Sequence, residues 1–285
     1  ITAAAAVSPA AIFIILADAP PMTVAFYRLF FASLILLPIY LYHVFSKKIS
    51  SISKRDFLLT VISGLFLTAH FATWIKSLFY TTVSNSVILV TTTPIFVAIF
   101  AWIFLGEKMR LLGVSGILIA ITGSIVITGG DFSMNPDYLY GDILALIGAV
   151  MAGAYFTIGR QVRKSVQLLT YIFYCYTISA LGLLIVVIMF NEPLIGLSSK
   201  SYFYFFLLGL IPTVFGHSLY NWALKHLKAF LVGVCVLGEP LGATLLAWIV
   251  LAQTPLSFFY IGAGLIGIGV LILFSVEKTE TKALR

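Results

Sequence analysis

The sequence is dominated by apolar segments that are long enough to cross a lipid bilayer. A membrane-spanning α-helix needs roughly 17–25 mostly apolar residues. Ten such segments can be identified, at about 1–17, 22–45, 57–79, 83–105, 111–129, 141–160, 168–190, 202–224, 229–252 and 256–275. Charged residues make up only 9% of the chain, against about 25% in a soluble domain. The sequence therefore predicts an all-α integral membrane protein with ten transmembrane helices. Because the chain begins at Ile1, we expect the natural N-terminus to extend further.

Positive charges are distributed unevenly between the joints that connect these segments. Of the 17 Lys and Arg residues, 14 fall in alternate joints or in the C-terminal tail, whereas the opposite joints hold only Lys200. Arg28 and Lys76 lie inside spans. Short loops rich in Lys and Arg stay cytoplasmic, so we expect a multi-pass protein of the cell inner (plasma) membrane with both termini cytoplasmic. The net charge of +7 then reflects topology. We expect no nucleic-acid partner, because such a role would require a basic face on a soluble domain.

Two parts of the sequence resemble each other at an offset of 146 residues. Pro94 aligns with Pro240, and Trp102 aligns with Trp248. Each half contains five predicted spans, and because five is odd the halves would enter the membrane from opposite sides. Inverted repeats of this kind are typical of secondary transporters, whose substrate sites lie near the middle of the membrane between the repeats. We therefore predict two inverted five-helix repeats around a central cavity.

The repeat predicts the domain boundaries. We expect a first repeat over 1–129, an external linker over 130–140, a second repeat over 141–276 and a cytoplasmic tail over 277–285. The acids of the linker do not have the spacing of a calcium loop, and no Cys or His pair has metal-ligand spacing. We therefore expect no metal and no cofactor. Ten spans can enclose a cavity within one chain, so we expect a monomer or a weak dimer in contact with membrane lipid.

The spans on either side of each repeated proline also resemble a known family. The chain is similar to EamA-type members of the drug/metabolite transporter superfamily, over nearly its whole length, in the segments "NSVILVTTTPIFVAIFAWIFLGEKMRLLGVSGILIAITG", "FLVGVCVLGEPLGATLLAWIVLAQTPLSFFYIGAGLIGIG" and "SPAAIFIILADAPPMTVAFYRLFFASLILLP". Gly106-Glu107 and the second-span Arg28 match the family pattern, whereas Ala252-Gln253 departs from it in the second half. The resemblance implies ten helices around a central cavity and a transport function.

Glu239 is the strongest candidate functional residue. It lies about 11 residues into the ninth span, without another charged residue or a histidine within ten positions. A central acidic residue costs about 2.5–3.5 kcal/mol on insertion scales and usually faces a cavity or a partner. Pro240 leaves the carbonyl four residues earlier without its helical donor, so we predict a hinge here. Glu239 is then either a proton-coupling or substrate-binding carboxylate, or a structural partner of a buried cation.

Two spans carry similar polar pairs. His70 and Trp74 lie one helical turn apart in the third span, and His217 and Asn221 repeat that spacing in the eighth. The alternatives are cavity lining and interhelical hydrogen bonds that serve packing. Tyr155 is a further candidate, because an aromatic ring can stack on a planar ligand or contact a cation.

The first-half counterpart of the Glu239 segment contains hydroxyl groups and a proline. Thr92 and Thr93 precede Pro94, the second predicted hinge. Their hydroxyls can bind a ligand oxygen, or they can satisfy carbonyls of their own helix. Arg28 can extend its side chain toward the outer face of the membrane, or it can form a structural ion pair with Asp18 or Glu239, which is the arrangement we expect.

These observations together favour a secondary active transporter rather than an enzyme. It would move a small metabolite, amino acid or drug, with or without protons, by alternating access, and we expect export. The alternative is an integral membrane enzyme or flippase acting on a lipid-linked substrate. An enzyme would need a second catalytic group beside Glu239, for which the sequence offers only histidines.

Overall fold

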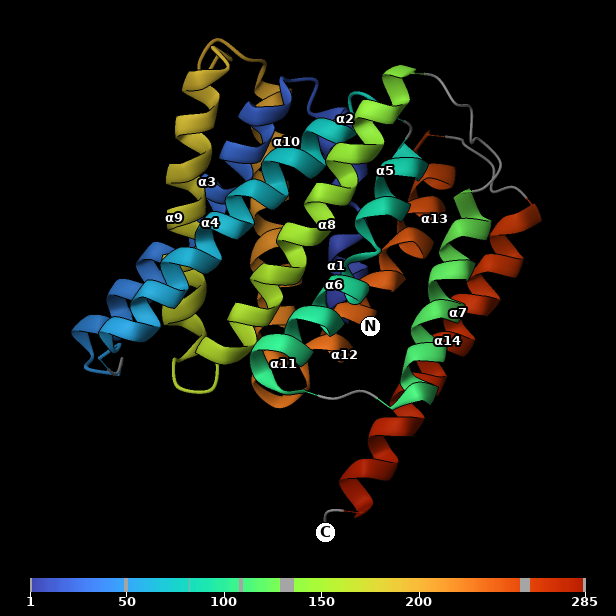
Figure 1. Ribbon diagram of the computed structural model, residues 1–285. Helices are drawn as coiled ribbons and strands as arrows, with labels where there is room; N and C mark the ends of the chain where they lie inside the picture. Colours follow the sequence, from blue (N-terminus) through green and yellow to red (C-terminus); the bar gives the residue numbers. More distant parts are fainter. Residues whose placement is uncertain are drawn as a thin grey trace.

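The computed structural model describes residues 2–48, 51–81, 83–107, 110–128, 136–251 and 257–283. In this part of the chain all regular structure is helical (Figure 1). The first half contains α1 (Thr2–Val7), α2 (Ala10–Leu16), α3 (Pro21–Phe45), α4 (Lys54–Ser77), α5 (Val83–Val90), α6 (Thr93–Phe100), the π-helix η1 (Ala101–Leu105) and α7 (Leu111–Thr128). The second half contains α8 (Pro136–Val162), α9 (Leu168–Met189), α10 (Ser199–Leu208), the π-helix η2 (Gly209–His217), α11 (Ser218–His226), α12 (Ala229–Cys235), the 3-10 turn η3 (Val236–Gly238), α13 (Glu239–Leu251) and α14 (Ser257–Ala283).

Local sequence signals account for several helix ends. Ser53 and Ser198 precede α4 and α10, and each side chain accepts a hydrogen bond from a backbone N–H of the first turn. Proline opens α3, where its fixed φ suits the first turn. Gly106 ends η1 with φ at +66°, a left-handed conformation that glycine adopts without strain.

Seven helical segments in the described part of the chain are long and apolar enough to cross a membrane. They are Pro21–Phe45, Lys54–Ser77, Ser86–Leu105, Leu139–Val162, Leu168–Met189, Ser199–His226 and Ala229–Val250. Three shorter apolar segments, Thr2–Leu16, Leu111–Gly123 and Tyr260–Ile272, coincide with the predicted first, fifth and tenth spans. The all-helical membrane class is therefore confirmed, and the number ten stays a prediction.

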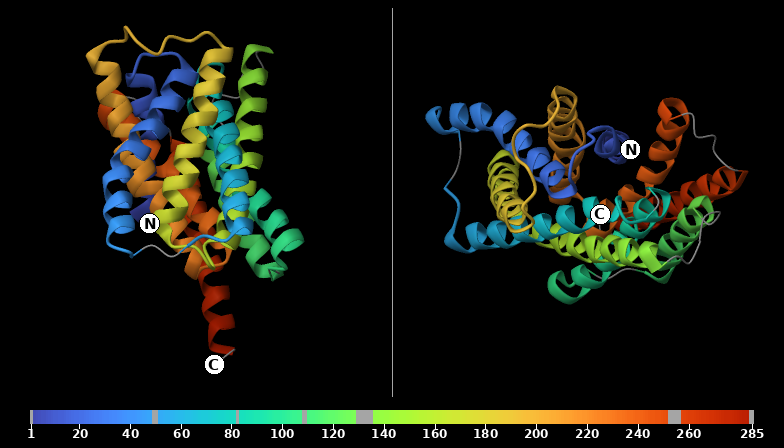
Figure 2. Two further views of the ribbon diagram at one scale, coloured as in Figure 1. Left: turned by 90° about the vertical axis from the view of Figure 1, so that its left-hand side faces the viewer. Right: turned by 90° about the horizontal axis from the view of Figure 1, so that it is seen from above.

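The most extensive packing beside the α7–α14 pair joins α4 to α8 and to α9, and α3 to α9. α7 and α14 pack chiefly against each other and lie together at one side of the bundle (Figures 1 and 2). Glycines allow this close approach, since a Cβ at Gly123 would lie 2.6 Å from the carbonyl oxygen of Gly262. A Cβ at Gly269 would lie 2.5 Å from the carbonyl oxygen of Gly116. Small residues commonly bring membrane helices together in this way.

Two helical segments are interrupted near their middle, at matching positions. One segment stops at Val90 and resumes at Thr93 after a short turn. The other changes at Cys235 into one 3-10 turn and resumes as α-helix at Glu239. In both cases the second residue of the new helix is a proline, which cannot donate a backbone hydrogen bond to the preceding turn. The starts of α5, α6 and α7 recur 146 residues later as the starts of α12, α13 and α14.

Most of the described Lys and Arg residues lie at one end of the bundle, which we call the basic end. It comprises the turns that follow α3, η1, α8 and α11, drawn at the bottom of Figure 1. Its basic residues are Lys47, Lys48, Lys54, Arg55, Arg110, Arg160, Arg163, Lys164, Lys225 and Lys228.

Candidate functional site

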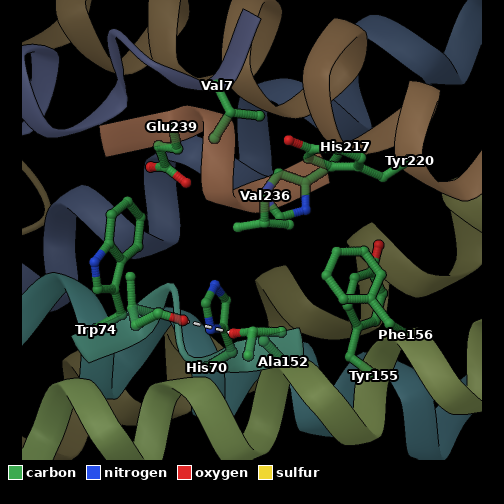
Figure 3. A pocket seen from close by; sticks show the side chains of 12 residues that line it. Val7, His70, Trp74, Ala152, Tyr155, Phe156, His217, Tyr220, Val236 and Glu239 are labelled. Carbon is green, nitrogen blue, oxygen red and sulfur yellow. Dashed lines mark hydrogen bonds between the residues drawn. The ribbon is translucent and has the colours of Figure 1, made fainter. Parts of the chain in front are cut away.

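A small cavity lies inside the bundle, between the interrupted helices and the central pair α4 and α8. Its volume is about 30 Å³, enough for one or two water molecules. It is lined by Val7, His70, Trp74, Val90, Thr93, Ala152, Tyr155, Phe156, His217, Tyr220, Val236 and Glu239. Figure 3 shows side chains from α4 and α8 on one side of it and from η2, α11, η3 and α13 on the other. Both halves of the chain therefore contribute to the cavity.

Glu239 is the acidic side chain that faces this cavity. It is the first residue of α13 and is only 4% exposed. Its carboxylate points into the cavity (Figure 3), and Oε1 has no hydrogen-bond partner among the described residues. An unpartnered buried carboxylate oxygen is costly, so this position is a functional candidate by its geometry as well as by its chemistry.

Arg28 is completely buried beside the cavity and is held mainly by neutral groups. Its Nε donates to Thr213 Oγ1 at 2.8 Å, and its guanidinium lies 4.2 Å from the ring centre of Phe71. Nη1 and Nη2 have no partner among the described residues. The sequence predicted an ion pair with Asp18 or Glu239, but no direct pair is recorded for Arg28 among these residues. Arg28 and Glu239 still interact electrostatically.

His70 and Trp74 both line the cavity from α4. Their rings are stacked, with centres 5.9 Å apart and planes inclined by 11°. The Nδ1 of His70 lies 2.9 Å from the carbonyl oxygen of Gly148 on α8, which fixes the ring. Trp74 Nε1 is buried without a hydrogen-bond partner in the described part of the chain. This indole can therefore donate to a ligand without first breaking a bond inside the protein.

In the corresponding pair of the other half, His217 lines the cavity and Asn221 packs behind its wall. His217 lines the cavity, and its ring centre lies 6.5 Å from that of His70. Asn221 is fully buried behind the cavity wall, where its Nδ2 donates to the Tyr155 hydroxyl and to the His217 carbonyl. Tyr155 itself lines the cavity. Asn221 is therefore placed to position Tyr155 rather than to contact a ligand.

A π-helix explains why these two pairs are out of register with the repeat. His70 and Trp74 match His217 and Asn221 at an offset of 147, one more than the offset of the broken helices. The π-helix η2 ends at His217, and π-bulges inside α-helices frequently occur at functional sites. A π turn accommodates one additional residue, so this insertion brings His217 to the face on which His70 lies in its own helix.

The threonines before Pro94 bond to their own helix in this structure. Thr92 and Thr93 donate to the carbonyl oxygens of Leu89 and Val90, at 2.7 and 2.6 Å. Thr93 lines the cavity, whereas Thr92 is half-buried outside its lining. Of the two, only Thr93 has the position expected of a ligand contact.

Sequence reasoning missed the apolar part of the cavity wall. Val7, Val90, Ala152, Phe156 and Val236 line it but resemble ordinary lipid-facing or packing residues in the sequence. Only Val236 carried a signal, because it lies one turn before Glu239 on the same helix face. No group of three or more His, Cys, Asp or Glu side chains could hold a metal ion within the described ranges.

Comparison with known proteins places these features in a family. The sequence model of the EamA-like transporter family matches residues 1–129 and 139–275. An "Uncharacterized transporter" of Archaeoglobus fulgidus is 24% identical, and the match covers 94% of this chain and 90% of that protein. "Solute carrier family 35 member G1" of Mus musculus is 29% identical over 53% of this chain and 46% of its own. One crystal structure has the same fold, with a TM-score of 0.80 at 20% identity, covering 98% of this chain and 96% of its own.

Proposed function

The chain belongs to the EamA-like transporter family, and from this premise we propose that it is a secondary active transporter that works by alternating access. It is a membrane protein with several spanning helices, and its relatives are named as transporters. The proposed cargo is a small metabolite, amino acid or drug, and the proposed direction is export across the inner membrane. The observation that carries the proposal is Glu239, a carboxylate with an unpartnered oxygen in a cavity lined by both halves.

Two regularities support ten spans arranged as two inverted repeats. The helix starts at Val83, Thr93 and Leu111 recur 146 residues later. The family match is itself divided into two segments, 1–129 and 139–275. These support repeats at 1–129 and 141–276, joined by an external linker and followed by a tail.

The contacts between helices support the same two-fold relation. Gly123 packs against the backbone at Gly262, and Gly269 packs against the backbone at Gly116. Gly123 corresponds to Gly269 at the offset of 146, and Gly116 corresponds to Gly262. The two contacts are therefore equivalent to each other when the two repeats are interchanged. The same holds for larger elements, because α4 packs on α8 in the way that α10 and η2 pack on α1 and α2.

The basic end supports a cytoplasmic location for both termini. Basic joints stay on the cytoplasmic side of bacterial membrane proteins, and the described basic residues are concentrated at one end of the bundle. With the ten spans proposed here, both termini lie at that end.

The size of the cavity supports a conformational cycle. Sites that bind small molecules usually enclose about 300–1,000 Å³, far more than the 30 Å³ found here. A substrate can enter only if the helices around the cavity move apart. The interruptions before Pro94 and Pro240 are suitable hinges, because helix kinks concentrate at proline.

The cavity supports distinct roles for its side chains. We assign to Glu239 the binding of a proton or of a cationic group of the substrate, and to Trp74 and Tyr155 the aromatic contacts. His70, His217 and Thr93 complete the polar lining, and Asn221 positions Tyr155. Arg28 balances the charge of Glu239 electrostatically instead of forming a direct ion pair with it. A monomer suffices for this cycle, and a weak dimer is compatible with it.

An integral membrane enzyme or flippase acting on a lipid-linked substrate is the second candidate. Hydrolysis would require an acid or base to work with Glu239, and the cavity offers only His70 and His217. Release of a cleaved headgroup by the purified protein would favour the enzyme. Equilibration of a labelled lipid between leaflets would favour the flippase.

The transporter proposal is tested by uptake into proteoliposomes. A panel of amino acids, amines, sugars and nucleosides would be offered with and without a pH gradient, to the wild type and to Glu239→Gln. We expect saturable uptake that depends on the gradient in the wild type and not in the variant. If the variant keeps the full response to the gradient, Glu239 is structural and not the coupling site. Uptake that does not saturate would contradict the transporter proposal itself.

A further inference from the structure

A charged cluster connects four helical segments at the basic end of the bundle. Glu107, just after η1, accepts a hydrogen bond from Arg160 Nε on Oε1 and from the Ala229 N–H on Oε2, both at 2.9 Å. Arg160 Nη1 also donates to the carbonyl oxygens of Leu224 and Lys225, at 2.7 and 3.1 Å. We call these five residues the basic-end latch. The latch joins the end of the interrupted segment α5–α6–η1 to the ends of α8 and α11 and to the start of α12.

The latch lies next to the cavity along two of these helices. Arg160 comes five residues after the cavity-lining Tyr155 on α8, about 8 Å along the axis. Leu224 comes one helical turn after the cavity-lining Tyr220 on α11. The latch therefore fastens these helices to one another between the cavity and the basic end.

The bonds of the latch are of a strong kind. Hydrogen bonds with a charged donor or acceptor are roughly twice as strong as neutral ones. The side chains of Arg160 and Glu107 are only 16% and 11% exposed, so water screens their pair less than it would screen a surface pair. The single Arg160 side chain bonds both a carboxylate and the C-terminal carbonyls of a helix, where a cation is favoured.

The repeat lacks the same charges on the opposite side. At the offset of 146, Arg160 corresponds to Ile14, whose neighbours Phe13 and Ile15 are also apolar. Glu107 corresponds to Gln253, which lies outside the described residues. The basic end therefore has an ionic pair of Glu107 and Arg160. The matching positions of the other repeat hold a neutral amide and an aliphatic side chain.

We propose that the basic-end latch is the cytoplasmic gate of the transport cycle, and that its charges make the conformation closed to the cytoplasm the resting state. This rests on the proposed transport function, because a gate has meaning only where the cavity opens alternately to both sides. Opening toward the cytoplasm requires Glu107 to leave Arg160 and the start of α12. Ile14 and Gln253, at the matching positions of the other repeat, cannot form the same ionic pair.

The test measures cavity access and needs no substrate, so its outcome is separate from that of the transport assay. Cys175 and Cys235 are replaced by alanine, and Ala152→Cys places one reporter thiol in the cavity wall. A membrane-impermeant maleimide is added to inside-out and to right-side-out vesicles. For Glu107→Gln, we expect cytoplasmic labelling to become about tenfold faster, because a hydrogen bond to a charged group is lost. Labelling from the outside should become slower.

Two further variants make the result specific to the latch. Glu192→Gln is the matched control, because Glu192 Oε2 also accepts a backbone N–H at a helix start, that of Thr23, at 2.8 Å and at the opposite end. It should leave cytoplasmic labelling unchanged.

Arg160→Lys keeps the positive charge but loses the forked guanidinium that reaches three acceptors. It should accelerate cytoplasmic labelling as Glu107→Gln does. It also provides the readout if Glu107→Gln does not fold. Unchanged labelling in the folded latch variants would overturn the proposal and leave the latch a purely structural connection.

Discussion

The two interrupted segments, 83–105 and 229–251, share the same break in the helix before a proline but differ in side-chain chemistry. In both, a new helix begins with a proline as its second residue, at positions 146 residues apart. At the first interruption, the Thr93 hydroxyl donates to the carbonyl of Val90 and is thereby satisfied. At the second, the carbonyl of Val236 accepts the backbone N–H of Glu239, and the carboxylate keeps an oxygen free. The comparison teaches that two similar segments can share the same helix interruption while only one of them carries a charge into the cavity.

The largest expected effect follows from removing that charge. In Glu239→Gln, we expect the stimulation of uptake by a pH gradient to fall about tenfold or more, within the usual range of coupling between two binding sites. Thr93→Val at the equivalent position of the other segment is the matched control. It should change uptake less than about threefold, because a hydroxyl bonded within a membrane protein contributes little on average. Equal losses in the two variants would show that the two segments are functionally alike.

The second prediction concerns Arg28, which balances the charge of the second segment from the first half of the chain. Arg28→Met leaves Glu239 as an uncompensated buried carboxylate, and leaving a buried charge uncompensated costs about 3–5 kcal/mol. We expect a large drop in the thermal midpoint of the purified protein, partly recovered in the double variant Arg28→Met/Glu239→Gln. Thr213→Val removes the acceptor of Arg28 Nε and the hydroxyl bond to the Leu208 carbonyl, leaves both charges in place, and should cost about 1–2 kcal/mol. A double variant no more stable than Arg28→Met would show that the two charges do not interact.

The third prediction separates the matching polar pairs of α4 and η2–α11. Trp74→Ala should raise the KM of transport by about tenfold, because a cation contact to an aromatic ring is worth up to about 2 kcal/mol when desolvated. It should also lower the thermal midpoint, because the buried indole leaves a cavity behind. Asn221→Ala should lower the free energy of unfolding by about 1–3 kcal/mol without a comparable rise in KM, because the buried Tyr155 hydroxyl loses its donor. KM and the thermal midpoint, measured on both variants, show whether Trp74 contacts the ligand while Asn221 serves packing. A KM effect as large in Asn221→Ala as in Trp74→Ala would place both residues at the ligand.

The sequence predicted the class of fold and the polar half of the site for identifiable reasons. Glu239, His70 and Trp74 are polar or bulky in spans where such residues are rare, so their composition alone marks them. For Arg28 the sequence indicated a charged partner and gave no sign of the neutral contacts that the structure describes. The guanidinium packs on Phe71 and bonds Thr213. The first contact depends on how two helices of the first half pack, and the second depends on how the two halves meet.

The remaining features could not be derived because they depend on backbone irregularities or on shape. The π-helix that brings His217 to the cavity leaves only a one-residue change in the repeat offset. Val7 and Ala152 line the cavity without any property that distinguishes them from packing residues. The role of Asn221 behind Tyr155 likewise follows from packing, since the same spacing in α4 leads to a residue that faces the cavity.

The smallest expected effects come from the two prolines, which test whether the shared break in the helix is a hinge. Pro94→Ala and Pro240→Ala each restore a backbone N–H that can donate to the carbonyl four residues earlier, at Val90 or Val236. We expect transport to slow by about threefold with the pH dependence retained, because the interruption moves less freely while the cavity groups remain. Pro240→Ala should have the larger effect. Its new N–H competes for the carbonyl that now accepts the Glu239 N–H, and a regular helix at that point would turn the carboxylate. At Pro94 the competitor is a threonine hydroxyl, which can be displaced without moving the backbone.

Turnover measured on both variants under one gradient shows which proline has the larger effect. Faster turnover in either variant would show that proline rigidifies the segment instead of allowing it to bend.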